Sequence, residues 1–235
     1  MNSYRFDALP PKVDVTGTFD SSCELLLSDV ALAALENNRL KLKILHIGEK
    51  PKLFRFKLSL KCKSGNIHIM LASDDANIDF GDQSAGTYHL RLWRNSSIII
   101  GPRTTANQVV IVCNNSAFVC GEDCMFSDGI LIQSADQHGI VDIAAGKIVN
   151  DTFRTIRLGN HVWLGRDCSL MPNAAVGNGA IIGAGSIVTK PIPAQSLAVG
   201  IPARVIKKNY TWTRPPTELD GYAQRAIAAW QAQHG

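Results

Sequence analysis

Aliphatic residues recur at every sixth position between residues 158 and 193. This stretch divides into LGNHVW, LGRDCS, LMPNAA, VGNGAI, IGAGSI and VTKPIP, and each six begins with Leu, Ile or Val. A period of six matches neither the 3.6-residue period of a helix nor the two-residue alternation of a strand. It predicts a solenoid whose walls are short strands joined by tight turns, with aliphatic side chains stacked inward about 4.8 Å apart.

The other places of each six support this interpretation. Glycine fills the second place four times, and we assign these glycines, with Asn160, Asn178 and Asp167, to corners that need positive φ or support from a side chain. Upstream the sixes are less regular: IGPRTT from Ile100, VCNNSA from Val112, CGEDCM from Cys120, FSDGIL from Phe126 and IQSADQ from Ile132. We therefore expect a β-helix over residues 66–206.

Two segments near the N-terminus alternate with period two. RLKLKI (39–44) and FRFKLSLKCK (54–63) are separated by GEKP (48–51), which predicts a β hairpin within an N-terminal β subdomain at residues 1–65. One face of the second segment carries Arg55, Lys57, Lys61 and Lys63. This basic face is either a docking surface for an acidic polymer or a solvated edge that discourages aggregation.

The C-terminal tail, residues 207–235, contains a helical pattern. In TELDGYAQRAIAAWQAQ (217–233), apolar residues fall on one stripe of a helix, and Thr217 is a candidate N-cap. Because a solenoid must cover its last coil, we expect this helix to act as a cap. The predicted fold is mainly β, a parallel β-helix with an N-terminal β hairpin or subdomain and a C-terminal capping helix.

Composition narrows the class of protein. The net charge of +4 is too small for a nucleic-acid groove, and no basic run is interleaved with aromatic residues. No apolar run is long enough to span a membrane, and the first twenty residues lack the apolar block of a signal peptide, so we expect a soluble cytoplasmic protein. Cys120, Cys124 and Cys168 fall at repeat positions that favour small buried side chains, which predicts packing residues rather than disulfides.

The repeat is broken by QSADQHGIVDIAAGKIVND, residues 133–151. The interior of a solenoid has no room for an insertion, so residues 139–151 are expected to form an external loop. His138 stands where this loop leaves the wall. Asp136, two residues earlier, would project to the same side of an extended strand and could accept a hydrogen bond from the imidazole.

The sixes resemble the hexapeptide repeat of left-handed parallel β-helix acyltransferases. SADQHGI, followed by GKIVN and IRLGNHVWLG, is similar to the catalytic segment of the sugar and polysaccharide O-acetyltransferases of this group. The left hand is implied by this resemblance alone, because the general preference for right-handed crossovers would predict the opposite. The resemblance also implies a homotrimer, with acetyl-CoA in the groove between two subunits and a sugar or polysaccharide as acceptor.

Carried over residue by residue, the resemblance makes His138 the general base, Asp136 the group that orients it, and Trp163 an active-site residue near the cofactor. IGAGSIVTK and GIPARVIKK resemble the closing motif of the family. That motif implies cofactor contacts from Ala184, Lys190, Arg204 and Lys207. The expected chemistry is direct transfer, in which His138 takes a proton from the acceptor hydroxyl as its oxygen attacks the thioester.

Two departures from the family pattern concern the loop and the acceptor. The catalytic histidine is often followed by proline, where this chain has Gly139, and the closing motif usually reads NPA, where this chain has Ile201, Pro202 and Ala203. These departures put in doubt the local loop geometry and the acceptor preference.

Other functions remain as alternatives. Within the acyltransferases these are serine O-acetyltransferase and xenobiotic O-acetyltransferase, and outside them a non-catalytic β-helix scaffold. A metal site of the γ-carbonic anhydrase type is rejected, because it needs two histidines five residues apart and His46, His68, His89 and His234 are scattered. His161 lies inside a regular repeat and is interpreted as structural.

Overall fold

The computed structural model describes residues 1–234, and most of these residues wind into one parallel β-solenoid. Wall 1 is an eight-stranded sheet in which only the first pair of strands is antiparallel. Its strands, in spatial order, are β1 (Asn2–Arg5), β3 (Glu24–Leu27), β5 (Lys57–Leu60), β7 (Asn77–Phe80), β9 (Ser96–Ile100), β11 (Ser116–Cys120), β16 (Arg154–Leu158) and β19 (Ala175–Val176).

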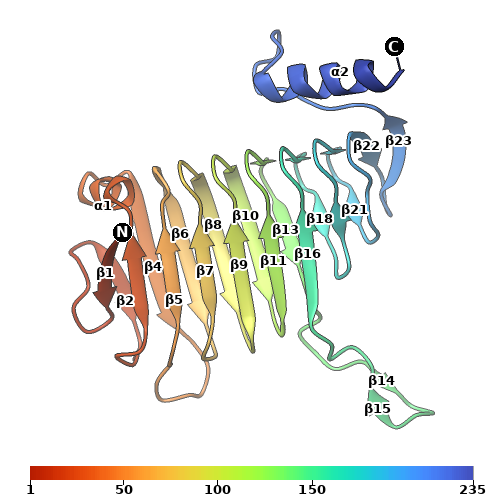
Figure 1. The fold of residues 1–235 in the computed structure, drawn as a ribbon. Helices are drawn as coiled ribbons and strands as arrows, with labels where there is room; N and C mark the ends of the chain where they lie inside the picture. The colour runs from red at the N-terminus through yellow and green to blue at the C-terminus, as the bar shows by residue number, and fades with distance from the viewer. Residues whose placement is uncertain (235) are drawn as a thin grey trace.

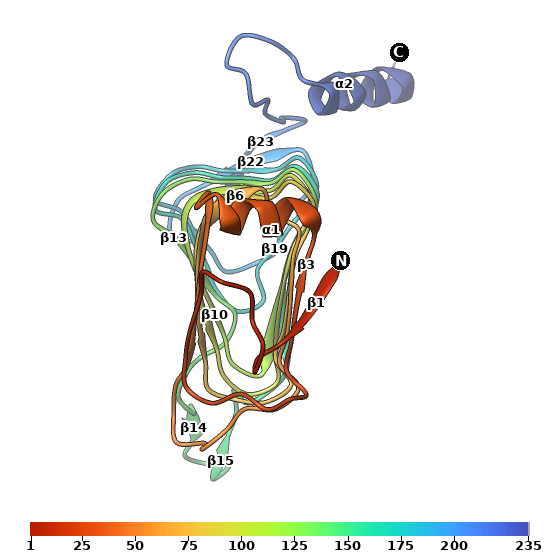
Figure 2. The same ribbon diagram turned by 90° about the vertical axis from the view of Figure 1, so that its left-hand side faces the viewer.

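Wall 2 belongs to the second large sheet, and wall 3 branches from it at β10. The strands of wall 2 are β2 (Val13–Thr16), β4 (Leu40–His46), β6 (Ser64–Leu71), β8 (Ala85–Leu92), β10 (Thr105–Cys113), β12 (Met125–Phe126), β17 (Trp163–Leu164), β20 (Ile181–Ile182), β22 (Ser196–Val199) and β23 (Arg204–Lys208). Wall 3 contains β13 (Ile130–Gln133), β18 (Ser169–Leu170) and β21 (Ile187–Val188). The start of β10 pairs with β12 and its end with β13, so the later coils have three walls (Figures 1 and 2).

The six-residue repeat is confirmed by the register of the strands. Leu158 pairs with Val176, Leu164 with Ile182 and Leu170 with Val188, so each coil advances by 18 residues, or three sixes. These six first-place side chains are all buried, at 4% exposure or less. Each fully buried aliphatic side chain contributes about 1.5–3 kcal/mol, so the inward stack is the main stabilising feature of these coils.

The second-place glycines are required for a different reason than the sequence suggested. None of them has positive φ; the left-handed residues are those of the fourth place, namely His161, Asp167, Asn173, Gly179 and Gly185. An added Cβ on Gly177 would overlap the backbone nitrogen of Ala194 in the next coil. Glycine is therefore needed there because neighbouring coils approach too closely for a side chain.

The asparagines of these corners connect adjacent coils. The Asn178 side-chain oxygen accepts a hydrogen bond from the Asn160 backbone N–H at 2.8 Å, and the Asn160 side-chain oxygen accepts one from the Glu122 N–H at 3.1 Å. These bonds form a short ladder parallel to the solenoid axis. The support from side chains predicted for the corners is thus present at both asparagines.

The solenoid extends further toward the N-terminus than predicted. β4 and β5, which correspond to the two alternating segments, lie in different walls and do not form the predicted hairpin. β4 pairs in parallel with β2 and β6, and β5 pairs with β3 and β7. The parallel ladders cross residue 65, so residues 13–65 wind in the same way as the coils that follow.

Two helices accompany the solenoid. The sequence analysis did not predict α1 (Asp29–Glu36), which begins after the N-cap Ser28 and buries Ala31, Ala34 and Leu35. The C-terminal helix is confirmed as α2 (Gly221–His234), but its N-cap is Asp220 rather than Thr217. One oxygen of Asp220 accepts hydrogen bonds from the N–H groups of Tyr222 and Ala223.

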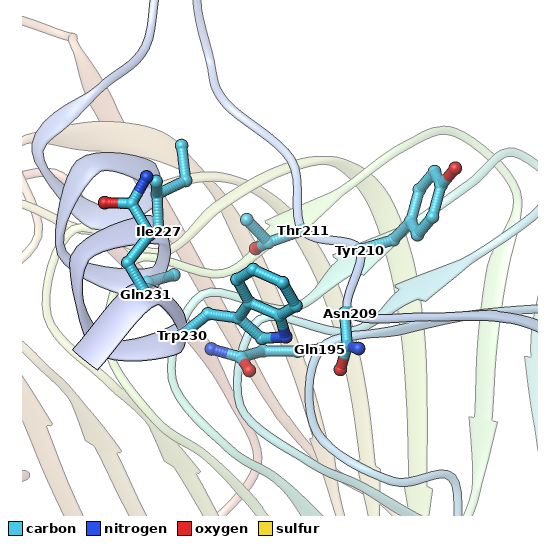
Figure 3. Close-up of a pocket in the computed structure, with 8 residues that line it drawn as sticks. Gln195, Asn209, Tyr210, Thr211, Ile227, Trp230 and Gln231 are labelled. Carbon is cyan, nitrogen blue, oxygen red and sulfur yellow. The ribbon is translucent and has the colours of Figure 1, made fainter. Parts of the chain in front are cut away.

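α2 lies beside the last coils rather than across the end of the solenoid (Figure 1). The outer edge of β22 is covered by β23, which pairs with it in antiparallel. Ala223 is buried, whereas Ile227 and Trp230 are 41% and 44% exposed. They line a groove against Gln195 and residues 209–211, where the Trp230 indole lies beside Gln195 and Asn209 and the Tyr210 ring points away (Figure 3).

The remaining sequence predictions concern cysteines and membrane insertion. All six cysteines are buried and free, as predicted for packing residues. Burial raises the pKa of the Cys62 thiol to about 12 and that of Cys113 to about 11. Neither helix, over residues 1–234, is long and apolar enough to cross a membrane.

Replacement of Gly177 by alanine tests the close approach of the coils. Because the added Cβ overlaps the backbone of Ala194, we expect Gly177→Ala to lower the free energy of unfolding by about 1–3 kcal/mol. Urea denaturation would measure this value, with Ser169→Ala on the outer face of the same region as control. Equal stability of the two variants would show that the coils are not packed this tightly.

Candidate active site

The break in the repeat forms an arm that projects from the solenoid, as predicted. Residues 139–151 leave the wall after β13 and contain a short antiparallel pair, β14 (Val141–Asp142) and β15 (Lys147–Ile148). Figure 1 shows this arm on the side of the solenoid opposite α2. The insertion lengthens one coil, because Leu131 pairs with Ser169, 38 residues later, instead of the 18 of the following coils.

The base of the arm is fixed by side-chain hydrogen bonds. Asn150 donates to Asp136 at 3.1 Å and to the His138 carbonyl at 2.8 Å, and its side-chain oxygen accepts from the Ile140 N–H at 2.7 Å. Arg94 donates to both carboxylate oxygens of Asp151, at 3.2 and 2.9 Å. These bonds and the positive charge of Arg94 hold the pKa of Asp151 below its usual value. The place where the chain leaves the wall is therefore well defined.

His138 is exposed beside this fixed base. It lines a pocket of about 200 Å³ together with Arg94, Asp136 and Asn150. Within residues 1–234, Asp136 accepts its hydrogen bond from Asn150 through Oδ2, and no bond joins its carboxylate to the His138 imidazole. The pairing of Asp136 with His138 therefore stays a prediction, while an anchoring role of Asp136 is visible.

Trp163 lies on wall 2, in a different cleft. The cleft has a volume of about 320 Å³ and is lined by Ala184, Gly183 and Arg166 as well as Trp163. The indole N–H of Trp163 is 3.4 Å from the Ser127 hydroxyl, a long hydrogen bond. Two of the predicted cofactor residues, Trp163 and Ala184, are thus brought together.

The three basic residues predicted to contact the cofactor are divided between two places. Arg204 pairs with Val199 in the β22–β23 ladder, and Val199 packs against Gly183, next to Ala184. Lys207 lies on the same strand, with its ammonium 5.8 Å from the centre of the Tyr210 ring. Lys190 instead follows β21, at the edge where wall 3 meets wall 1.

The predicted residues therefore form two groups on one chain. Trp163, Ala184 and Arg204 belong to wall 2 and the corner that ends it, whereas His138 and Lys190 lie at the edge between walls 3 and 1. Trp163 and Ala184 line one pocket, and His138 lines another. A single chain therefore does not bring all of the predicted site residues together.

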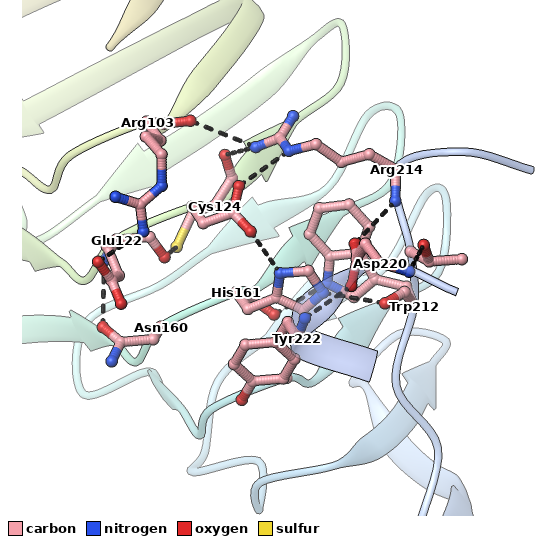
Figure 4. A network of polar contacts seen from close by, with 12 residues as sticks. Arg103, Glu122, Cys124, Asn160, His161, Trp212, Arg214, Asp220 and Tyr222 are labelled. Carbon is pink, nitrogen blue, oxygen red and sulfur yellow. Dashed lines mark hydrogen bonds and ion pairs between the residues drawn. The ribbon is translucent and has the colours of Figure 1, made fainter. Parts of the chain in front are cut away.

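The histidine interpreted as structural, His161, is fully buried at the edge between walls 1 and 2 (Figure 4). Its Nδ1 is 2.7 Å from Asp123 and its Nε2 is 2.9 Å from the Trp212 carbonyl. Both partners offer oxygen atoms, so each ring nitrogen is held beside a hydrogen-bond acceptor. The ring is stacked between Trp212 and Tyr222, with centroids 4.1 and 3.9 Å away.

Asp123 also receives a hydrogen bond from Arg214, at 2.9 Å. Burial would raise the pKa of Asp123, but the hydrogen bonds from His161 and Arg214 outweigh it and the pKa is lowered. Arg214 reaches further, to the Thr105 hydroxyl at 3.0 Å and the Cys124 carbonyl at 3.2 Å. Together these contacts fasten the C-terminal segment along this edge.

The sequence analysis missed this network, although two signals were present. Asp220 directly precedes the helical stripe, as an N-cap does, and Trp212 and Arg214 stand in a proline-containing segment that is otherwise polar. Nothing in the repeat itself indicates that the segment returns to contact residues a hundred positions earlier.

Comparison with known proteins identifies the repeat. Residues 155–190 match the family model described as bacterial transferase hexapeptide (six repeats). The polysialic acid O-acetyltransferase of Escherichia coli O1:K1 / APEC is 38% identical over 122 residues, which cover 52% of this chain and 39% of that protein. The chain thus spans well under half the length of that relative.

A second relative and two crystal structures extend the match. The putative lipopolysaccharide biosynthesis O-acetyl transferase WbbJ of Escherichia coli K12 is 27% identical over 145 residues, 57% of this chain and 74% of that protein. The polySia-specific acetyltransferase NeuO is 28% identical with a TM-score of 0.70, covering 95% of this chain and 98% of that one. The polysialic acid O-acetyltransferase OatWY, at 18% identity and a TM-score of 0.55 over 92% and 98%, shares the fold. The resemblance seen in the sequence is confirmed.

Replacement of Asp123 by asparagine tests the buried charge network. The lowered pKa means that the carboxylate stabilises the fold above the ordinary pKa of aspartate, about 3.9, and that this contribution is lost as the pH falls further. We expect Asp123→Asn to lower the free energy of unfolding by about 3 kcal/mol at pH 7, with the difference shrinking below about pH 4. Urea denaturation at several pH values measures both effects.

The control is Asp7→Asn, which removes a carboxylate from an exposed pair with Arg5. Its effect should stay within about 0.5 kcal/mol. A loss of stability in Asp123→Asn that is the same at pH 7 and at pH 2.5 would contradict the charged network.

Proposed function

We propose that this chain, which carries the hexapeptide repeat of the bacterial transferases, is an O-acetyltransferase that takes its acetyl group from acetyl-CoA. The acceptor is a hydroxyl of a sugar or surface polysaccharide. The observation that carries this proposal is the match of nearly the whole solenoid to a polySia-specific acetyltransferase, at 28% identity and a TM-score of 0.70. The two relatives named as O-acetyltransferases of polysialic acid and lipopolysaccharide support the same class of acceptor.

His138 acts as the general base in this proposal. Its exposed imidazole takes the proton of the acceptor hydroxyl, and the oxygen forms a bond to the carbonyl carbon of the thioester. The C–S bond then breaks, and the imidazolium returns the proton to the leaving thiolate. General-base assistance of this kind accelerates a reaction by about 10² to 10⁴. The fixed base of the arm supports this role, because Asn150 bonds the His138 carbonyl and the Ile140 N–H.

Asp136 orients the imidazole in the productive complex. Asn150 uses only Oδ2 of this carboxylate, and Oδ1 has no hydrogen-bond partner within residues 1–234. A carboxylate accepts several hydrogen bonds at once, so anchoring the arm and orienting His138 are compatible. The tetrahedral intermediate needs a donor for its oxyanion, and the indole N–H of Trp163 suits this, since its bond to Ser127 is long and easily exchanged.

The division of the residues into two groups supports a site shared between copies of the chain. His138 and Lys190 of one chain would face Trp163, Ala184 and Arg204 of its neighbour, with acetyl-CoA between them. A closed ring of three chains would repeat this arrangement at each interface. Arg204, Lys207 and Lys190 would then supply positive charge to the phosphates of the cofactor.

Replacement of His138 by alanine tests the general base. Because the imidazole is exposed and makes no side-chain hydrogen bond within residues 1–234, His138→Ala should fold normally and lose acetyl transfer by about a hundredfold or more. Release of free CoA in the presence of a polysaccharide acceptor measures the rate. The matched control is Lys147→Ala on the exposed part of the arm. A His138→Ala protein that keeps most of its activity would remove His138 from the mechanism.

Replacement of Arg204 by alanine tests the position of the cofactor. Loss of a charge-assisted bond to phosphate should weaken acetyl-CoA binding about tenfold at low salt and less at high salt. Calorimetric titration would measure the affinity, and Lys208→Ala on the same strand is the control. If affinity is unchanged in Arg204→Ala at both salt concentrations, the phosphates lie elsewhere.

A further inference from the structure

The edge between walls 1 and 2 carries a shallow trough, and the chain fills only part of it. Over the later coils the trough holds the C-terminal segment, where Trp212 stacks on His161 and the Thr211 hydroxyl donates to the Gly179 carbonyl at 3.0 Å. The occupied part ends where Arg214 donates to the Thr105 hydroxyl. From there toward the N-terminus the same edge is uncovered.

The uncovered part, called here the open trough, has a volume of about 420 Å³. It begins at Thr105 and Ala106 and continues past Gly86 and Gly65 to Arg39 and Lys41. Its floor is bare backbone, because an added Cβ on Gly65 would overlap the Gly86 carbonyl and one on Gly86 would overlap the Ala106 carbonyl. The trough crosses β4, β6, β8 and β10, so at about 4.8 Å per strand it is about 14 Å long.

The open trough is basic at its N-terminal end. Arg39 and Lys41 line it, and within residues 1–234 neither side chain forms an ion pair with a carboxylate. Lys12 and Lys43 line the adjoining pocket, in which the single acidic residue is Asp14, 3.6 Å from the Lys43 ammonium. Positive charge is therefore in excess along this part of the edge.

The basic face singled out in the sequence has less of this excess. On wall 1 and its turns, Lys63 has no ion pair within residues 1–234, but Arg55 is paired with Asp75, Lys57 with Glu24 and Lys61 with Asp79. Each of these paired cations meets a carboxylate of a neighbouring coil. Of the two surfaces, the open trough has more unpaired positive charge available to a partner.

We propose that the open trough binds a stretch of a carboxylate-bearing polysaccharide. Its length exceeds one sugar ring, its cations suit carboxylates, and the amides of Asn38 and Asn66 and the hydroxyl of Thr87 can bond sugar hydroxyls. The trough holds the acceptor polymer at a distance from the residues assigned to acetyl transfer, and in naming the acceptor class it rests on the proposed function. An extended segment already occupies the continuation of the same edge, which shows that its shape accepts a linear chain.

The test measures binding of fluorescently labelled polysialic acid to the full chain by anisotropy, without acetyl-CoA. The double variant Arg39→Ala/Lys41→Ala should bind at least about tenfold more weakly at 50 mM salt, and the difference should shrink at 300 mM salt. The matched control, Lys57→Ala/Lys61→Ala, removes the same charge from wall 1 and should bind like the parent protein. Thermal unfolding verifies that both variants are folded.

Four results would overturn the proposal, three of which concern the variants. These are unchanged affinity in the trough variant, an equal loss in the control variant, and a change of oligomeric mass in the trough variant, which would make the edge an interface between copies. Labelled dextran, a neutral polymer, should not bind, and binding equal to that of polysialic acid would also overturn it. Because the assay involves no transfer, a failure of the proposed O-acetylation would appear separately, as a chain that binds polymer but releases no CoA.

Discussion

The structure depends on the vertical stacking of inward aliphatic side chains from one coil to the next. Leu158 over Val176 and Leu164 over Ile182 require that every coil return its side chains to the same positions. That requirement sets the 18-residue coil, the left-handed residue at five of the six fourth places and the bare glycine where backbones approach. It also forces any extra residues outward, so an insertion becomes an arm at the surface. The proposed active site follows from this, since His138 stands at the point where the arm departs.

The edge between walls 3 and 1 and the edge between walls 1 and 2 have different roles. At the edge between walls 3 and 1, short polar contacts from Asn150 and Arg94 hold an exposed histidine beside a pocket, an arrangement suited to chemistry. At the edge between walls 1 and 2, His161 is buried, hydrogen-bonded and enclosed by aromatic rings, an arrangement suited to holding the C-terminal segment in place. His138 and His161 look similar in the sequence, but their different surroundings give them different roles. A proton acceptor must reach solvent and substrate, and His161 reaches neither.

The later coils could be predicted from the sequence because each six-residue unit there contains one short strand and one corner. Upstream the strands lengthen and the coils grow to 20 or 21 residues, as in the pairings of Asn77 with Ser97 and Ser64 with Ala85. The long strands alternate with a period of two residues, and this alternation hides the longer period of the coil. It therefore predicts a hairpin for β4 and β5, which the structure does not form. The helix α1 was missed although Ala31, Ala34 and Leu35 have helical spacing, because it replaces a corner of a coil that was not recognised. For the site, the sequence located the arm and His138 but could not show that Trp163 faces another cleft, since that depends on which wall each strand joins.

A solenoid is nearly one-dimensional, because each coil touches only its neighbours, and such a stack tends to fray from its last coil. The return of Arg214 to Thr105 alters this property by linking residues 109 positions apart. The C-terminal segment spans the coils between β10 and β20, so the last coils cannot separate without also breaking the hydrogen bonds of Asp123 with His161 and Arg214. The last coils therefore unfold together with the coils to which the segment links them, rather than one at a time. Cooperative unfolding of this kind gives a single, sharper melting transition.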